Sequence, residues 1–324
     1  MRLLVTGGAG YIGSVVAAQL LAGGHEVVVL DDLSTGHADA VPGSARFVHA
    51  SLLDAPVLAA VFADGFDGVL HFAAKSLVGE SVAHPEHYWR NNVIGTFELL
   101  EAMVAASVPR LVFSSTAAVY GEPDQVPILE TAPTRPTSAY GASKMAVDAM
   151  IGTFALAHGL AATSLRYFNV AGASGHLGER HATETHLIPI VLQVAEGRRA
   201  HVQVYGTDYP TPDGTAIRDY IHVEDLARAH LLALDASKPG RHAIYNLGNG
   251  LGSSVREVIE AARRVTGRPI ATVDAPRRQG DPAVLVASSA RIGQELGWTP
   301  HKPALDDMVV DAWACLLGHG RERA

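Results

Sequence analysis

Short apolar runs alternate with longer amphipathic segments through the first half of the chain. The runs are rich in Val, Leu and Ile, which is typical of strands buried on both faces of a parallel sheet. The predicted strands are Leu3–Thr6, Glu26–Leu30, Arg46–His49, Gly68–Phe72, Leu111–Ser115 and Ala162–Arg166. Helical patterns occupy Tyr11–Leu21, Glu86–Ala106 and Ser138–His158. This alternation predicts an α/β fold with a doubly wound parallel sheet.

The alternation of apolar runs and amphipathic segments changes after about Asn169. From there the segments become shorter, and the loops become richer in Gly, Pro and charged residues. Helices are still predicted at Val223–Asp235, Val255–Thr266 and Pro303–Leu317. We therefore expect two domains, at 1–168 and at 169–324, the second being a smaller α/β domain interleaved with the first.

Composition narrows the class of protein. The 324 residues carry a net charge of −8, which argues against a nucleic-acid-binding surface. Cys315 is the one cysteine, so an internal disulfide framework is excluded. No apolar run approaches the roughly 18 residues of a membrane helix. We expect a cytoplasmic enzyme that binds neither nucleic acid nor a membrane.

A glycine-rich turn follows the first predicted strand and leads into the first helix. Gly7, Gly10 and Gly13 fit the spacing of a dinucleotide-binding loop, and Gly8 offers a second register. Such a turn needs glycine because the backbone must approach a pyrophosphate with no Cβ in the way, while the helix N-terminus attracts the anion. The position between strand and helix predicts a Rossmann domain with a bound dinucleotide.

Asp31 directly follows the second predicted strand and lies 18 residues after Gly13. A carboxylate at about this distance binds the ribose hydroxyls of an adenosine. It would repel a 2′-phosphate, so Asp31 predicts NAD rather than NADP.

Three further side chains suggest proton-transfer chemistry. Thr116 follows a predicted strand, and Tyr140 and Lys144 lie four residues apart on one helical face. A free phenol has a pKa near 10, and an ammonium about 5 Å away is worth roughly 3 kcal/mol, which lowers that pKa by about two. Tyr140 is therefore predicted to act as the general base, with Lys144 lowering its pKa and Thr116 holding the same substrate oxygen.

The glycine loop, the strand-end hydroxyl and the Tyr140–Lys144 pair, in this order, resemble the extended short-chain dehydrogenase/reductase superfamily. Further stretches resemble the UDP-glucose 4-epimerase family along the whole chain. They are His71–Lys75, Val78–Ser81, Asn91–Val93, Arg166–Asn169, Tyr205–Gly214, Arg218–Val223 and Arg277–Asp281.

The resemblance implies an isomerase that interconverts UDP-glucose and UDP-galactose. Tyr140 would take the proton of the sugar 4-hydroxyl while NAD⁺ takes the hydride from C4. The 4-keto sugar would then turn and receive the hydride on its other face. The resemblance also implies a homodimer, built on the helices predicted at Glu86–Ala106 and Ser138–His158.

Site residues follow from the resemblance together with the motifs above. The expected NAD contacts are Gly7, Gly10, Tyr11, Ile12, Gly13, Asp31, Phe72, Ala73, Asn92, Thr116, Tyr140, Lys144 and Phe168. The expected substrate contacts are Thr116, Tyr140, Asn169, Leu187, Tyr205, Arg218, Arg278 and Asp281. The two arginines suit a diphosphate because guanidinium presents forked donors to phosphate.

Some positions depart from the family pattern. Ser51, Ser76 and His186 stand where an acidic residue, a lysine and an asparagine are often found. Leu285 stands where a tyrosine excludes N-acetylated sugars and a small residue admits them, so N-acetylhexosamine, pentose and uronate substrates stay open.

The sequence disfavours two other functions. A 4,6-dehydratase is disfavoured because Thr116 is followed by Ala117-Ala118, which cannot do acid–base work. A non-catalytic NAD-binding regulator would have no need of Tyr140 and Lys144 together with the arginines.

The chain has 16 histidines. The densest group is His176, His181, Glu184 and His186, which we read as a solvated loop, and no metal site is expected. His222 and His230 are read as structural.

Overall fold

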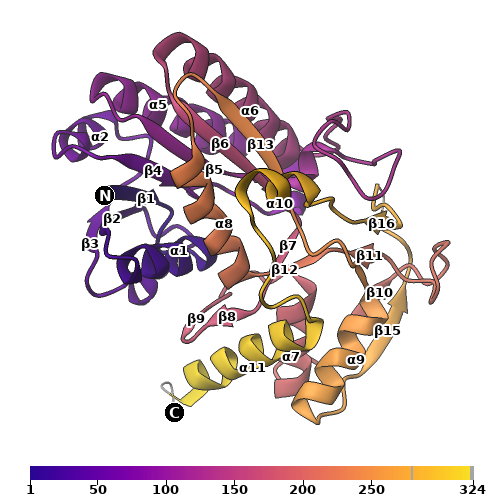
Figure 1. Ribbon diagram of the computed structural model, residues 1–324. Helices are drawn as coiled ribbons and strands as arrows, with labels where there is room; N and C mark the ends of the chain where they lie inside the picture. Colours follow the sequence, from indigo (N-terminus) through magenta and orange to yellow (C-terminus); the bar gives the residue numbers. More distant parts are fainter. Residues whose placement is uncertain (279, 322–324) are drawn as a thin grey trace.

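A seven-stranded parallel sheet forms the larger part of the molecule, in a computed structural model that describes residues 1–278 and 280–321 (Figure 1). The strand order is β13-β6-β5-β4-β1-β2-β3. The strands are β1 (Arg2–Thr6), β2 (Glu26–Asp31), β3 (Arg46–His49), β4 (Gly68–His71), β5 (Arg110–Thr116), β6 (Ala161–Tyr167) and β13 (His242–Leu247). The doubly wound α/β fold predicted from the sequence is confirmed.

Helices cover both faces of this sheet, and each face has its own apolar core. One face packs against α1 (Tyr11–Ala22), α8 (Val223–Ala236) and α10 (Ala290–Leu296). The other packs against α2 (Ala55–Phe62), α5 (Gly95–Ala105) and α6 (Ala139–His158). Burial on both sides explains why the strands read as unbroken apolar runs.

The order of the strands reverses between β1 and β4. The chain runs outward from β1 through β2 and β3, and then returns to place β4 on the other side of β1. In open parallel sheets a crevice for ligands forms at such a point, beyond the carboxyl ends of the strands. The loops after β1 and β4 are therefore the first place to look for a site.

The second half of the chain forms a smaller layered unit beyond that edge. A third core lies among α7 (Leu187–Glu196), α9 (Val255–Thr266) and α11 (Leu305–Arg321). Short strands join it in pairs or threes: β7 (Asn169–Ala171) with β12 (Tyr220–His222), β8 (Ala173–Ser174) with β9 (Leu177–Gly178), β10 (Val202–Tyr205) with β15 (Thr272–Ala275), and β14 (Ser253–Ser254) with β11 (Ile217–Arg218) and β16 (Val284–Leu285).

The two halves are interleaved in sequence. Strand β13 comes from the second half yet pairs in parallel with β6 in the large sheet. The division between residues 168 and 169 stays a prediction. Gln279 and residues 322–324, which belong to stretches interpreted above, lie outside the described residues.

One predicted helix differs from the structure. In place of a single helix over Glu86–Ala106 the chain forms α4 (Pro85–Tyr88), a π-helical turn η2 (Trp89–Ile94) and then α5, preceded by α3 (Val78–Ala83). Within the turn, the Asn92 amide pairs with the backbone of Lys75, with bonds of 2.8 and 3.0 Å. This tertiary contact, which periodicity does not reveal, accompanies the widened turn. Two short 3₁₀ turns complete the fold, η1 (Ala38–Ala40) and η3 (Ala117–Val119).

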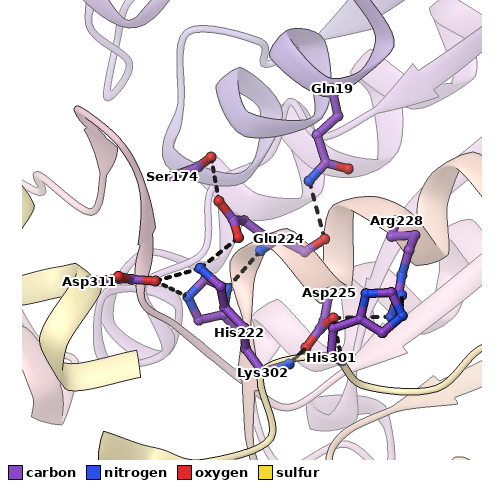
Figure 2. Close-up of polar contacts among 9 residues, drawn as sticks. All are labelled: Gln19, Ser174, His222, Glu224, Asp225, Arg228, His301, Lys302 and Asp311. Carbon is purple, nitrogen blue, oxygen red and sulfur yellow. Dashed lines mark hydrogen bonds and ion pairs between the residues drawn. The ribbon is translucent and has the colours of Figure 1, made fainter. Parts of the chain in front are cut away.

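The C-terminal segment is fastened to the start of α8 by a polar network (Figure 2). His222 caps α8 by accepting a bond from the Glu224 amide at 3.1 Å, and its Nε2 lies 3.0 Å from Asp311. Lys302 bridges Glu224 and Asp311 at 2.8 and 2.7 Å, and Asp225 accepts the backbone amide of Lys302 at 2.8 Å. The structural reading of His222 is confirmed.

His230 is also buried, with Nδ1 2.9 Å from the Leu226 carbonyl oxygen, so its structural reading is confirmed as well. No helix among the described residues is long and apolar enough to cross a lipid bilayer.

Candidate active site

A large cavity opens beyond the carboxyl ends of the parallel strands. Its volume is about 1680 Å³, larger than the roughly 300–1,000 Å³ typical of a pocket for one small ligand. It begins at the glycine loop and Asp31 and continues to Arg278 and Asp281 in the smaller unit. The cavity therefore has room for two ligands placed end to end.

The glycine loop shapes the first end of the cavity. Gly7 has φ +73°, and a Cβ there would stand 2.4 Å from the Ala73 nitrogen across the strand-order reversal. A Cβ on Gly13 would stand 2.2 Å from the Gly7 oxygen. These two glycines are required by packing within the protein.

Gly10 is different, because a Cβ there would meet only the Gly7 oxygen at 3.3 Å. It precedes α1 as the N-cap and lines the cavity. A pyrophosphate can approach the backbone closely where no side chain covers it, and the N-terminus of a helix attracts this anion. The loop therefore fits a dinucleotide.

Asp31 ends β2 beside this loop. Its carboxylate accepts the Ala9 amide at 3.0 Å and the Leu33 amide at 2.8 Å, and it lines the cavity. Burial raises the pKa of Asp31, and the two backbone bonds oppose that rise. Each carboxylate oxygen keeps a second acceptor position, so the group suits ribose hydroxyls.

The reactive middle of the cavity lies where β5 meets α6. Thr116 is the last residue of β5, and its hydroxyl accepts the Ala118 amide at 3.2 Å. Ser138 caps α6 through the Gly141 amide, which fixes the first turn of the helix that carries Tyr140. Tyr140 and Thr116 both line the cavity.

Lys144 lies one turn further along α6 and also lines the cavity. Its Nζ donates to the Ser114 carbonyl oxygen at 2.8 Å and stands 4.7 Å from the centre of the Phe113 ring. Burial lowers the pKa of Lys144 to about 7, although Asp148 opposes this.

The prediction that Lys144 lowers the pKa of Tyr140 is wrong for this structure. Burial raises the pKa of Tyr140, and the nearby Thr116 hydroxyl opposes that rise. The reason is that Lys144 is itself buried and its ammonium is directed to a backbone carbonyl.

Sequence reasoning missed the support behind Lys144. Asp148 lies four residues after it on α6, and its carboxylate bonds Arg166 at 2.9 and 3.0 Å in a pair almost closed to solvent. Tyr120 joins the pair through Arg166 at 3.1 Å. The spacing between Lys144 and Asp148 was the available clue.

Asn92 is the one expected cofactor contact that does not line the cavity. Its amide is occupied by the Lys75 backbone and by Ser143 at 3.1 Å, and its side chain is buried. The structure makes it a residue that positions the loop after β4, where Phe72 and Ala73 do line the cavity.

The far end of the cavity carries the predicted cationic groups. Arg218 forms an ion pair with Asp281, and the Arg278 guanidinium lies 4.0 Å above the Tyr205 ring. Asn169 donates to the Asp219 carbonyl oxygen at 3.0 Å, which orients its side chain.

All the other expected contacts border the same space. These include Tyr11, Ile12, Phe168 and Leu187, together with the departing residues Ser51, Ser76, His186 and Leu285.

Two carboxylates of the loop before α7 are buried, although Ala182, Thr183, Thr185 and His186 are exposed, and this corrects part of the sequence-based interpretation. Glu179 replaces His176 in the group, and the side chains of Glu179 and Glu184 are only 8% and 4% exposed. His181 and His186 form ion pairs with both carboxylates at 2.7–3.7 Å. The repeat of Glu-x-His in this stretch was the clue in the sequence.

Comparisons with known proteins agree with this geometry. Residues 3–248 match the model of the NAD dependent epimerase/dehydratase family. The chain is 60% identical over 320 residues to the UDP-glucose 4-epimerase of Streptomyces lividans, covering 98% of this chain and 97% of that protein. It is 58% identical over 315 residues to the UDP-glucose 4-epimerase of Corynebacterium glutamicum, covering 97% and 95%.

A solved relative has the same fold throughout. The crystal structure of UDP-glucose 4-epimerase from Bifidobacterium longum in complex with NAD⁺ and UDP is 37% identical, with a TM-score of 0.92 and coverage of 99% of both chains. The chain belongs to the NAD dependent epimerase/dehydratase family, among its UDP-glucose 4-epimerases.

Proposed function

We propose that the chain interconverts UDP-glucose and UDP-galactose by inversion at C4, with Tyr140, Lys144 and Thr116 as its catalytic residues. The observation that carries the proposal is the position of Tyr140 and Thr116 in one cavity, between a dinucleotide loop and an arginine-bearing end. The Bifidobacterium relative was solved with NAD⁺ and UDP, which supports the same two ligands here.

The first end of the cavity suits NAD. Gly10 leaves backbone open to the pyrophosphate, and Asp31 accepts ribose hydroxyls. Phe72, Ala73 and Phe168 border the space between that end and Tyr140. NAD⁺, when bound, supplies the hydride acceptor and a positively charged ring.

Tyr140 moves the proton of the sugar 4-hydroxyl. Burial alone would keep this phenol protonated at neutral pH. A nearby positive charge favours the phenolate, and the ring of bound NAD⁺ would supply it. Lys144 anchors this face of α6 to β5 through its bond to the Ser114 carbonyl oxygen. Thr116 holds the same oxygen through its hydroxyl and so orients it for proton transfer in both directions.

The other end of the cavity suits the UDP handle. Arg218 and Arg278 supply forked donors for a diphosphate, and Asp281 accepts hydroxyl groups. Binding strength concentrated on UDP leaves the sugar free to turn, which inversion at C4 requires.

Leu285 bears on which sugars are accepted. Its side chain lines the cavity from β16 and is half-buried. N-acetylhexosamine, pentose and uronate substrates are therefore to be compared with UDP-galactose in the assay below.

We also infer a homodimer. The helical segment that the resemblance assigns to the interface exposes Trp89, Ile94 and Phe97 at 43%, 45% and 38%, and α6 exposes Leu156 at 83%. Sedimentation equilibrium measures the mass in solution; a mass of one chain at micromolar concentration contradicts the inference. The cytoplasmic location stays a prediction, to be tested by cell fractionation.

The deciding experiment is a coupled assay of UDP-galactose conversion by the purified chain, together with mass spectrometry of its bound nucleotide. We expect UDP-glucose to form without net accumulation of NADH, because the hydride returns in each cycle. Stoichiometric release of NADH, or NAD binding with no conversion of any UDP-sugar, would contradict the proposal.

A further inference from the structure

Four side chains with metal-ligating atoms converge on the loop between β9 and α7. They are Glu179, His181, Glu184 and His186, and one ligand atom from each lies within 4.8 Å of all the others. We propose that this cluster is a binding site for a divalent transition metal of the zinc type. The four side chains come from a stretch of eight residues in the pattern Glu-x-His-x-x-Glu-x-His.

The distances suit a tetrahedral ion. Zinc binds imidazole nitrogen and carboxylate oxygen at about 2.0–2.2 Å, so neighbouring ligand atoms in a tetrahedron stand about 3.3 Å apart. Nδ1 of His186 lies 2.7 Å from Glu179 and 3.2 Å from Glu184. Nδ1 of His181 lies 3.2 Å from Glu179 and 3.7 Å from Glu184. Small outward shifts of each side chain would therefore admit the ion.

Charge balance points the same way. The Glu179 and Glu184 side chains are more than nine-tenths buried, and neither forms an ion pair with a lysine or arginine in the part of the chain that the structure describes. Buried carboxylates require compensating positive charge. One divalent cation supplies two charges while both imidazoles stay neutral.

One buried nitrogen atom among these four side chains lacks a hydrogen-bond partner. Nδ1 of His181 has no solvent contact and no hydrogen bond of acceptable geometry, although both carboxylates lie beside it. The Nδ1 nitrogen of His181 is therefore placed to bind an ion held between the two carboxylates.

The ligand set indicates a structural ion. Four protein ligands fill a tetrahedral zinc site and leave no position for a water or a substrate. His186 is the residue before α7, and it lines the substrate cavity beside Leu187. A metal here would hold the loop that forms this wall of the cavity, without taking part in the transfer of hydride or proton.

The test measures the metal itself. The full-length chain, purified without a histidine tag and incubated with excess Zn²⁺, is dialysed against metal-free buffer and analysed by plasma mass spectrometry. We expect about one zinc per chain. Replacement of zinc by Co²⁺ should give the strong visible absorption of tetrahedral cobalt, and removal with a chelator should lower the melting temperature until zinc is restored.

Matched variants locate the site. Glu184→Gln keeps the size of the side chain but removes its charge and should lose the zinc, whereas His176→Asn alters an exposed histidine in the neighbouring turn between β8 and β9 and should keep it. Circular dichroism checks that each variant is folded. The proposal is overturned if the wild-type chain retains no zinc after dialysis, if its cobalt form shows only octahedral absorption, or if folded Glu184→Gln retains as much zinc as the wild type.

Discussion

Lys144 on α6 is tied to β5 by a hydrogen bond of 2.8 Å from its Nζ to the Ser114 carbonyl oxygen. The same strand ends two residues later in Thr116, which lines the cavity together with Tyr140. Helix and strand are therefore joined one turn from the phenol. This arrangement holds Tyr140 in a fixed direction toward the cavity, which proton transfer requires.

Tyr140→Phe is expected to lower kcat by about 10²–10⁴-fold, the usual contribution of a general acid–base group. Affinity for UDP should stay within a few-fold, because Arg218 and Arg278 are untouched. Conversion of UDP-galactose and calorimetric titration with UDP measure the two quantities.

Tyr88→Phe provides the matched control. Tyr88 packs edge-on to Tyr140, with ring centres 6.4 Å apart, but its hydroxyl bonds Leu77 and Glu80 and it does not line the cavity. Its kcat should remain near that of the wild type. Equal losses in both variants would mean that the phenol of Tyr140 has no special role.

Gly10→Ala should separate cofactor binding from folding. The new Cβ meets only the Gly7 oxygen at 3.3 Å, so the free energy of unfolding should fall by about 1 kcal/mol or less. NAD binding should fall at least about tenfold, because the methyl group occupies the pyrophosphate approach. Fluorescence titration with NAD and chemical denaturation measure the two effects.

Gly13→Ala should reduce stability more than it reduces NAD binding. Its Cβ would stand 2.2 Å from the Gly7 oxygen, so the loop itself must shift and stability should fall by more than about 1 kcal/mol. A Gly10→Ala variant that binds NAD normally would remove the loop from the proposed cofactor site.

Leu285→Gly should raise the preference for N-acetylated sugars. Removal of the isobutyl group makes room in the cavity wall, and the size of a hydrophobic pocket discriminates by about 10–200-fold per methylene. The measurement is the ratio of kcat/KM for UDP-N-acetylglucosamine to that for UDP-glucose. An unchanged ratio in a folded, active variant would exclude Leu285 as the gate.

His71 should make stability depend on pH. It is buried between Thr6 and Thr96, with bonds of 2.7 and 2.8 Å, and burial, together with Lys144, lowers its pKa to about 3. In the unfolded chain His71 takes up a proton near pH 6.5, whereas in the folded chain His71 stays neutral. The free energy of unfolding therefore falls as the pH falls below 6.5. Between pH 6.5 and 5 the loss from this group is about 2 kcal/mol.

The comparison is between urea denaturation at pH 6.5 and at pH 5 for the wild type and for His71→Gln. The variant should lose less stability between the two pH values, whereas replacement of the exposed His176 should change nothing. Equal pH dependence in wild type and His71→Gln would show that His71 does not resist protonation.

Much of the site was predictable because its signals are local. The Gly7–Gly13 turn, Asp31 at a strand end and the Tyr140–Lys144 spacing each depend on neighbours within a few residues. Parallel strands buried on both faces are equally easy to predict, because they appear in the sequence as apolar runs. The sheet and its loops follow from these features.

Other features depend on contacts far apart in sequence. The pKa of Tyr140 is set by burial, which no spacing reveals. Asn92 does not line the cavity, and its side chain is hydrogen-bonded to the backbone of Lys75, 17 residues away. The burial of Glu179 and Glu184 likewise depends on how this loop folds.

The network of Figure 2 has a consequence for synthesis of the chain. Asp311 and Lys302 complete the anchoring of α8, which packs against α1 behind the glycine loop. The start of α8 therefore gains its last polar partners only when nearly the whole chain has been synthesised. Premature termination before Lys302 would leave His222 without Asp311 and Glu224 without Lys302, and such fragments would be open to proteolysis.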